Sequence, residues 1–455
     1  MLLLVSSFTA FAANGPLEVG FRDVSFVDGS RGQVRGRVYY PATVAGERAP
    51  ADTSQGPHPL VAMMHGWLGQ PFMYDGISEE IASWGYVVAS TGTEIGPFLN
   101  MDVFARDTVA LLHHVDDASG TAGDPLQGTV AAGDWGALGH SMGGATLAEL
   151  VDIEPRVRTI VAFMPYQGDA GYYDQLARYD GAALILSGSD DGTAPPAMQD
   201  RWFDSLDSTS RGLLLRMNGF GHQAVTDLAD DEGSVPKADQ FDAVAALSSL
   251  FVRAELGGEE DLYADLFALS ATLPGDRRSS SHVPATWATL DGSDVQVGVL
   301  GVGTDTTQVW MGTGPGATDD LGMDGAELQD ESPMVDGFAI RSLPVPWTDG
   351  LLLQARTGGA LGRVITLVEP VPPIEDTGLP ADTGDTGLGT DPGTGTTTDP
   401  TSGTTTDPTG TTGTTTPSGT TDGEPPKQGG CDSTGGAPAG LGALLLLALA
   451  GRRRR

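Results

Sequence analysis

The chain has 455 residues, which is enough for one large domain and additional segments. Its formal net charge of −36, with only 24 lysines and arginines, argues against nucleic acids or anionic membranes as partners bound through charge. The single cysteine, Cys431, excludes a disulfide bond within the chain. We interpret the acidity as a property of a protein that works outside the cell, with adaptation to a saline environment as the alternative.

Residues 1–13 are predicted to be a signal peptide. An apolar run at 2–12 ends in Ala10-Phe11-Ala12, the small-x-small pattern that a signal peptidase cuts. The run lacks a basic start, which a start codon placed too far downstream would explain. An apolar N-terminus without export is the alternative, and we expect an exported protein.

Residues 14–275 are expected to form an α/β domain, because short apolar runs alternate with amphipathic segments. Apolar runs of this kind predict a mostly parallel sheet that is buried on both faces and presents ligands at the carboxyl ends of its strands. The predicted strands are 60–64, 86–90, 135–139, 159–164, 183–187 and 213–217, and the predicted helices are 74–84, 102–115, 142–152 and 237–254.

The sequence GHSMGG at 139–144 matches the Gly-x-Ser-x-Gly pattern of a nucleophile elbow between a predicted strand and a predicted helix. Such a turn requires glycines beside the serine, because side chains there would collide with the neighbouring strand or helix. The turn would present Ser141 as a nucleophile, and the backbone N–H of Met142 could then stabilise an oxyanion.

A second oxyanion donor is expected in the turn after the strand at 60–64. Gly66 would let the backbone approach the substrate closely, and the N–H of Trp67 is the predicted donor. The Trp67 ring would line an acyl pocket, or serve only for packing. We interpret the neighbouring His65 as a structural histidine.

The loop after the strand at 183–187 carries two carboxylates, Asp190 and Asp191. Asp191 is the predicted acid of a catalytic triad, because Gly188-x-x-Asp191 with Pro195 four residues later is the usual form of such loops. Asp190 is the alternative, since an aspartate in a turn is often only a capping residue.

His222 is the predicted base, because it alone of the seven histidines lies in the loop after the last predicted strand. It would accept the proton of Ser141, while Asp191 fixes its tautomer and stabilises the imidazolium.

The C-terminal part of the chain has three further segments. Residues 291–371 predict a small β-rich domain, either a sandwich or an appendage, with strands at 295–302, 307–311, 337–343, 351–354 and 364–369. Residues 372–430 are near-repeats of Thr, Gly, Asp and Pro, which cannot bury a core and predict a disordered stalk. Calcium binding by the repeated aspartates is an alternative, although the ligand spacing of a known loop is absent.

Residues 431–455 combine Cys431, an apolar run at 437–450 and four terminal arginines. The run is short for a membrane span, which needs about 20 residues. The pattern resembles the C-terminal sorting tail of myxobacterial surface proteins, which implies processing near Cys431 and display at the cell surface. A simple membrane anchor is the alternative. In both cases the tail would engage the membrane or a sorting machinery.

Residues 15–274 resemble the dienelactone-hydrolase-like branch of the α/β-hydrolases, and within it the group of cutinase-like polyester hydrolases, chlorophyllases and platelet-activating-factor acetylhydrolases. The resemblance implies the α/β-hydrolase fold, the triad order Ser141, Asp191, His222, and a place for Tyr166 in the substrate cleft. Two differences from the polyesterases are His140, where they usually carry an aromatic residue, and the missing disulfide. The motifs that carry the resemblance lie in order at 58–66, 81–88, 139–144, 191–195 and 221–222.

We therefore expect an exported or surface-attached hydrolase that cleaves carboxylic esters through an acyl-enzyme, without a metal or an organic cofactor and without an obligate protein partner. A serine peptidase or amidase would share the triad. The rival hypothesis from another class is a surface display or adhesion protein whose hydrolase domain is an inactive scaffold.

Overall fold

The computed structural model describes residues 14–366 except for residue 30 and residues 229–231, 282–284, 292–293, 301–305, 313, 316–322, 325–326, 334–337, 347–351, 358–359 and 362–364. The described residues all belong to one compact unit, Met1–Glu375. The predicted signal peptide (1–13), stalk (372–430) and C-terminal sorting segment (431–455) lie outside them. Among the helices in the described part of the chain, none is long and apolar enough to cross a membrane.

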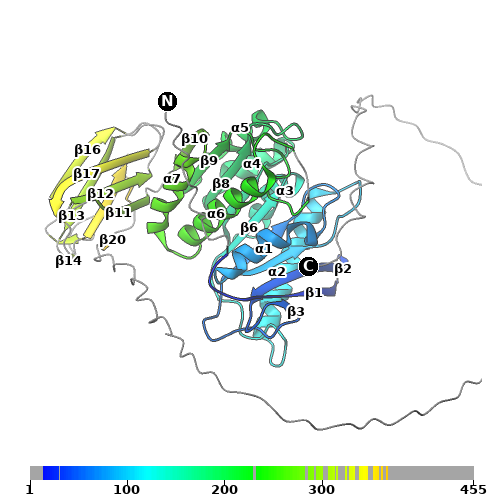
Figure 1. Ribbon diagram of the computed structural model, residues 1–455. Helices are drawn as coiled ribbons and strands as arrows, with labels where there is room; N and C mark the ends of the chain where they lie inside the picture. The colour runs from blue at the N-terminus through cyan, green and yellow to red at the C-terminus, as the bar shows by residue number, and fades with distance from the viewer. Residues whose placement is uncertain are drawn as a thin grey trace, which may run out of the picture. The chain divides into compact units, whose positions relative to one another are not determined.

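A ten-stranded sheet forms the centre of the α/β region (Figure 1). Its strand order is β10-β9-β8-β7-β6-β4-β5-β2-β1-β3. The six strands β4 to β9 are all parallel to one another. At one edge of these parallel strands, β2 of the antiparallel β1–β2 hairpin pairs antiparallel with β5. At the other edge, β10 pairs antiparallel with β9. The strands are β1 (Val19–Asp28), β2 (Gly32–Pro41), β3 (Gly46–Glu47), β4 (Leu60–Met64), β5 (Val87–Thr91), β6 (Trp135–His140), β7 (Val157–Phe163), β8 (Ala182–Gly188), β9 (Arg211–Met217) and β10 (Gly275–Ser281).

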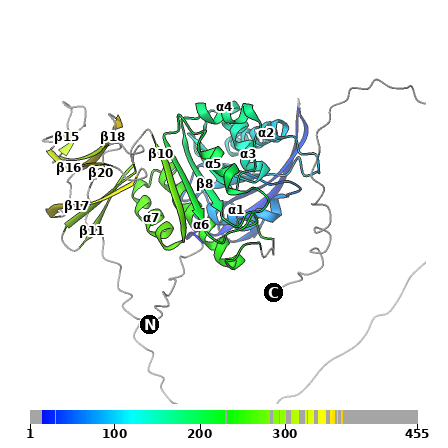
Figure 2. The same ribbon diagram turned by 90° about the horizontal axis from the view of Figure 1, so that it is seen from above.

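Helices cover both faces of this sheet, and each face has its own apolar core. Figure 2 shows α1, α6 and α7 on one side and α2, α3 and α4 on the other. Alternate residues of β4 point into the two cores, with Val61 and Met63 in one and Leu60 and Met64 in the other. The helical elements are η1 (Pro71–Tyr74), α1 (Asp75–Ser83), α2 (Met101–Gly120), α3 (Met142–Ile153), α4 (Ala170–Arg178), α5 (Pro196–Phe203), α6 (Lys237–Glu255), η2 (Glu260–Leu262) and α7 (Tyr263–Thr272).

The mostly parallel sheet and its flanking helices confirm the α/β prediction for this region. The six predicted strands and four predicted helices are all present, with ends within two residues of those expected, except that α2 continues five residues beyond residue 115. The sequence analysis did not identify β1, β2, α4, α5 or α7. It also missed β10, which continues the sheet past residue 275, because its sequence GDRRSSS lacks an apolar run.

The described residues from 285 onwards are β-rich. One sheet has the order β11-β12-β17, and another contains β16-β13-β18-β19 with β20 paired to β18. Valines 295, 297 and 299 of the first sheet share an apolar core with Val309 and Leu353 of the second. This shared core is the arrangement of a sandwich. The strands are β11 (Ala285–Asp291), β12 (Asp294–Leu300), β13 (Thr306–Gly312), β14 (Gly314–Pro315), β15 (Met323–Asp324), β16 (Glu327–Pro333), β17 (Phe338–Pro346), β18 (Leu352–Thr357), β19 (Ala360–Leu361) and β20 (Ile365–Thr366).

Candidate active site

Ser141 lies in a sharp turn between the end of β6 and the start of α3. Its backbone has φ 53° and ψ −116°, a left-handed conformation that costs an L-residue on the order of 1–3 kcal/mol. A Cβ added at Gly139 would lie 2.6 Å from the carbonyl oxygen of Gly143, and one added at Gly143 would lie 2.3 Å from that of Met64. The glycines beside the serine are therefore sterically required, as a nucleophile elbow demands.

The structure brings the three predicted triad residues into one hydrogen-bonded chain. His222 Nε2 lies 2.9 Å from Ser141 Oγ, and His222 Nδ1 lies 2.9 Å from Asp191 Oδ2. Because ionised Asp191 can only accept, Nδ1 carries a proton and Nε2 of the neutral ring accepts from the serine hydroxyl. Ser141, Asp191 and His222 come from three loops at the carboxyl ends of β6, β8 and β9, and all are at most 5% exposed.

Asp191 is the carboxylate that reaches the histidine, and its second oxygen is bound by the loop itself. Oδ1 accepts hydrogen bonds from the backbone N–H groups of Thr193 (2.9 Å) and Ala194 (2.7 Å). Asp190 is exposed and accepts instead from the hydroxyl groups of Ser189 and Ser234, which lower the pKa of its carboxyl group. The geometry therefore favours Asp191 over Asp190 as the partner of the base.

The turn after β4 lies directly against the serine. A Cβ added at Gly66 would be only 3.2 Å from Ser141 Cβ, so the absence of a side chain permits this approach. The next residue, Trp67, is 47% exposed, and its indole Nε1 donates to the carbonyl oxygen of Pro97 (3.0 Å). Met142 begins α3 immediately after the serine. Gly66, the residue before Trp67, thus lies against Ser141, and Met142 follows the serine directly; the oxyanion role of the Trp67 and Met142 N–H groups stays a prediction.

Two other predicted residues also lie beside the triad. Tyr166 is half-buried in the loop after β7, and its backbone N–H donates to the carbonyl oxygen of Ser141 (2.9 Å). His65 is buried, with ring nitrogens 2.8 Å from the carbonyl oxygens of Gly66 and Thr93, in agreement with its structural interpretation.

Two polar residues that the sequence analysis missed contact the acid and base loops. Gln199 Nε2 lies 3.3 Å from Asp191 Oδ2, and its Oε1 accepts from the Ser187 hydroxyl (2.6 Å). Glu232 accepts from the backbone N–H groups of His222 (3.0 Å) and Gly192 (3.2 Å), so one carboxylate links both loops. A glutamine on a helix after the acid loop was the available signal for Gln199. Nothing in the sequence points to Glu232.

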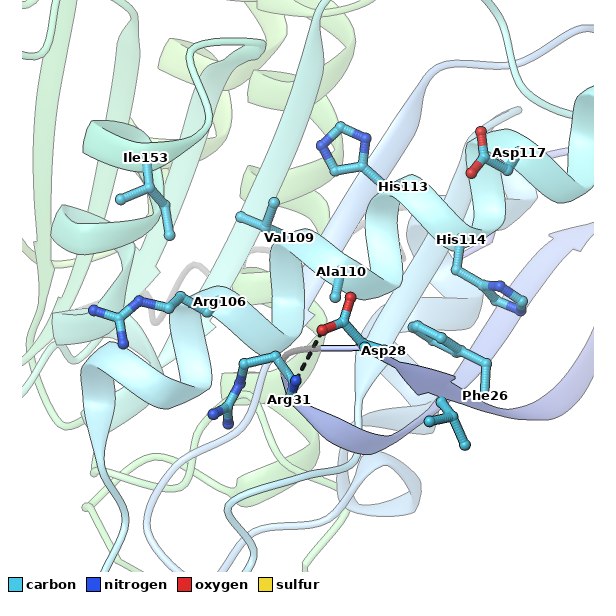
Figure 3. A pocket seen from close by; sticks show the side chains of 12 residues that line it. Phe26, Asp28, Arg31, Arg106, Val109, Ala110, His113, His114, Asp117 and Ile153 are labelled. Carbon is cyan, nitrogen blue, oxygen red and sulfur yellow. Dashed lines mark hydrogen bonds between the residues drawn. The ribbon is translucent and has the colours of Figure 1, made fainter.

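A separate groove of about 540 Å³ lies between the β1–β2 hairpin and α2 (Figure 3). The Phe26 and His114 rings stack there with centroids 4.0 Å apart, and Asp28 accepts from the backbone N–H of Arg31. The groove shares no lining residue with the Ser141 site. In the described part of the chain, no cluster of three or more His, Cys, Asp or Glu residues is arranged to bind a metal ion.

Comparisons with known proteins identify the family of this chain. A family model described as PET hydrolase-like (PETase) matches residues 5–234, about half of the 455 residues. Cutinase 1 of Thermobifida cellulosilytica is 26% identical over 215 residues, which are 47% of this chain and 74% of that protein. A cutinase of Thermobifida fusca is also 26% identical, with 64% of its length covered. Bis(hydroxyethyl) terephthalate hydrolase of Streptomyces coelicolor is 24% identical over 214 residues, which are 46% of this chain and 62% of that protein. The chain therefore belongs to the PET hydrolase-like (PETase) family.

Proposed function

We propose that the protein is an exported serine ester hydrolase that cleaves carboxylic esters through an acyl-enzyme. The observation that carries this proposal is the chain of two 2.9 Å hydrogen bonds from Ser141 through His222 to Asp191, built on a strained elbow. Membership of the PET hydrolase-like family and the names of the relatives, cutinase and bis(hydroxyethyl) terephthalate hydrolase, support esters as the substrate class.

In the acylation step, Ser141 Oγ attacks the ester carbonyl carbon while its proton moves to His222 Nε2. The carbonyl oxygen becomes an oxyanion, which the backbone N–H groups of Trp67 and Met142 stabilise. The imidazolium is stabilised by Asp191. When the C–O bond breaks, the Nε2 proton passes to the leaving alcohol, and the acyl group remains on Ser141.

In the deacylation step, His222 removes a proton from water, whose oxygen attacks the acyl carbon. The second tetrahedral intermediate collapses, the acid leaves, and Ser141 recovers its proton from His222. The exposed Trp67 ring and the half-buried Tyr166 would line the acyl side of the cleft.

The place of action is part of the proposal. The apolar segment at 2–12, the net charge of −36 and the tail after Cys431 support export and attachment at the cell surface. Along the sequence, the β-rich residues after 285 come between the catalytic domain and the predicted stalk. They could bind a surface while the catalytic domain hydrolyses esters.

The test is hydrolysis of p-nitrophenyl acetate, butyrate and palmitate by the full chain and by its Ser141→Ala variant, with p-nitroacetanilide as an amide analogue. We expect turnover of at least one ester, its loss in the variant, and a far lower rate with the amide. Faster cleavage of the amide would indicate an amidase. Equal background rates for both folded proteins would favour the display or adhesion hypothesis.

A further inference from the structure

A buried tyrosine and a buried histidine connect two parts of the candidate active site. Tyr74, the last residue of η1, and His140, the last residue of β6, are each 2% exposed. Tyr74 Oη lies 2.9 Å from the backbone nitrogen of Gly66 and 2.8 Å from His140 Nδ1. His140 Nε2 lies 2.8 Å from the carbonyl oxygen of His222.

With a neutral His140 ring, only one assignment of protons satisfies all three contacts of this chain. The Gly66 N–H can only donate, so it donates to Tyr74 Oη, and the His222 carbonyl can only accept, so His140 Nε2 carries a proton. Tyr74 then donates its hydroxyl proton to Nδ1 of a neutral His140 ring. Burial lowers the pKa of His140 well below its usual value, and the neighbouring His222 lowers it further, which agrees with a neutral ring.

We propose that Tyr74 and His140 form a neutral positioning relay that fixes the oxyanion turn at Gly66 and Trp67 relative to the backbone of His222. This inference rests on the serine mechanism proposed above. One end of the relay binds the residue before the Trp67 N–H, and the other end binds the residue that carries the base. The relay therefore couples the two groups that must be aligned during attack by Ser141.

The neutral state of His140 is also required by the chemistry of the base. The His140 and His222 rings have centroids 4.7 Å apart, and His222 becomes positively charged in each half-reaction. A second positive charge at this distance would oppose that protonation in a buried site. A neutral donor at Nε2 orients His222 without this repulsion.

At position 140 the relay requires a side chain with one hydrogen-bond acceptor and one donor at a fixed separation. Glutamine carries an acceptor oxygen and a donor nitrogen separated by one carbon, the same pattern as Nδ1 and Nε2 of a neutral histidine. Phenylalanine preserves a ring of similar size at position 140 or 74 but removes the hydrogen bonds. These substitutions separate the hydrogen-bonding role from the packing role.

The kinetic experiment compares Tyr74→Phe, His140→Phe, the double variant and His140→Gln in the full chain with p-nitrophenyl butyrate. We expect each Phe variant to lose about 10-fold to 100-fold in kcat with KM nearly unchanged, since misalignment of this order costs up to about 10²-fold. The double variant should lose no more than His140→Phe, because both substitutions break one relay. His140→Gln should recover most of the lost rate.

Several outcomes would overturn the relay. One is a kcat loss in the double variant that equals the product of the losses in the two single variants. Another is a wild-type kcat in both Phe variants. A third is a lowered thermal midpoint with unchanged kcat, which would indicate packing alone.

A second measurement does not depend on activity: histidine ¹⁵N NMR of the Ser141→Ala chain from pH 5 to 8 should show His140 as a neutral Nε2–H tautomer. A Nδ1–H tautomer, or titration of His140 in this range, would contradict the relay even if the esterase proposal holds. A chain without Ser141-dependent turnover would refute the esterase proposal, and the NMR spectrum would still decide the hydrogen-bond pattern.

Discussion

The acid–base side of the candidate site and its oxyanion side are built in different ways. The Asp191 side chain is completely buried, and its two oxygens accept hydrogen bonds from Thr193, Ala194, Gln199 and His222. Trp67, on the oxyanion side, exposes 47% of its surface. The difference indicates that the base is kept in one geometry by an internal network, while the substrate-facing loop remains accessible.

The acid–base side predicts the largest loss. Asp191→Asn should lower kcat by about 10⁴-fold, because an asparagine cannot enforce the tautomer in which His222 Nε2 accepts the serine proton. Asp190→Asn is the matched control one residue away and should change kcat by less than about threefold, since exposed Asp190 contacts Ser189 and Ser234. Steady-state kinetics with p-nitrophenyl butyrate checks both. A larger loss for Asp190→Asn would reverse the assignment of the acid.

The residue behind the acid should have a smaller effect. Gln199→Leu removes an amide that contacts Asp191 Oδ2 and accepts from Ser187. A hydrogen bond to a charged group contributes about 1.5–3 kcal/mol, so we expect a loss of about 10-fold to 100-fold in kcat. Gln127→Leu, at an exposed glutamine outside the site, serves as the control. Equal kinetics for the two variants would mean that Gln199 does not orient Asp191.

The Trp67 ring should affect KM more than kcat. Trp67→Ala leaves the backbone N–H in place and removes an exposed ring, whose contact with substrate is worth about 0.5–1.5 kcal/mol. We expect KM to rise about threefold to tenfold while kcat changes little, with Trp67→Phe intermediate. Titrations with esters of increasing acyl length measure this split. A fall in kcat equal to that of the Phe variants of the relay would show that the Trp67 ring also positions the reacting groups.

The smallest effect concerns stability at low pH. Burial lowers the pKa values of His58, His114 and His140 in the folded protein, whereas the unfolded chain has ordinary values near 6.5. The unfolded state therefore binds more protons below about pH 6.5, and the free energy of unfolding falls as the pH drops from the unfolded towards the folded pKa.

Thermal melts between pH 7 and pH 5 test this dependence. The midpoint should decline by roughly 2–4 °C for each kcal/mol lost. His58→Gln, which removes one titrating group outside the triad, should give a shallower decline than the wild type. A midpoint that rises towards pH 5 would show that carboxyl groups whose pKa values burial raises, such as buried Glu80, dominate instead.

The parts of the site that follow strand ends could be predicted from the sequence. The apolar runs before Ser141, Asp191 and His222 identify buried parallel strands, and a parallel sheet brings the loops after them to one edge. Gln199 and Tyr74 could not be found in this way, because their contacts depend on how α5 and η1 pack. The edge hairpin of β1 and β2 was missed for a related reason, since its strands carry few consecutive apolar residues.

The most direct test of the central claim is covalent trapping of the full chain with a p-nitrophenyl alkylphosphonate, followed by peptide mass spectrometry. The account predicts one phosphonyl adduct, located on Ser141, whose formation parallels the loss of esterase activity and does not occur in Ser141→Ala. Esterase activity that persists in Ser141→Ala, or inactivation with the adduct on another residue, would contradict it.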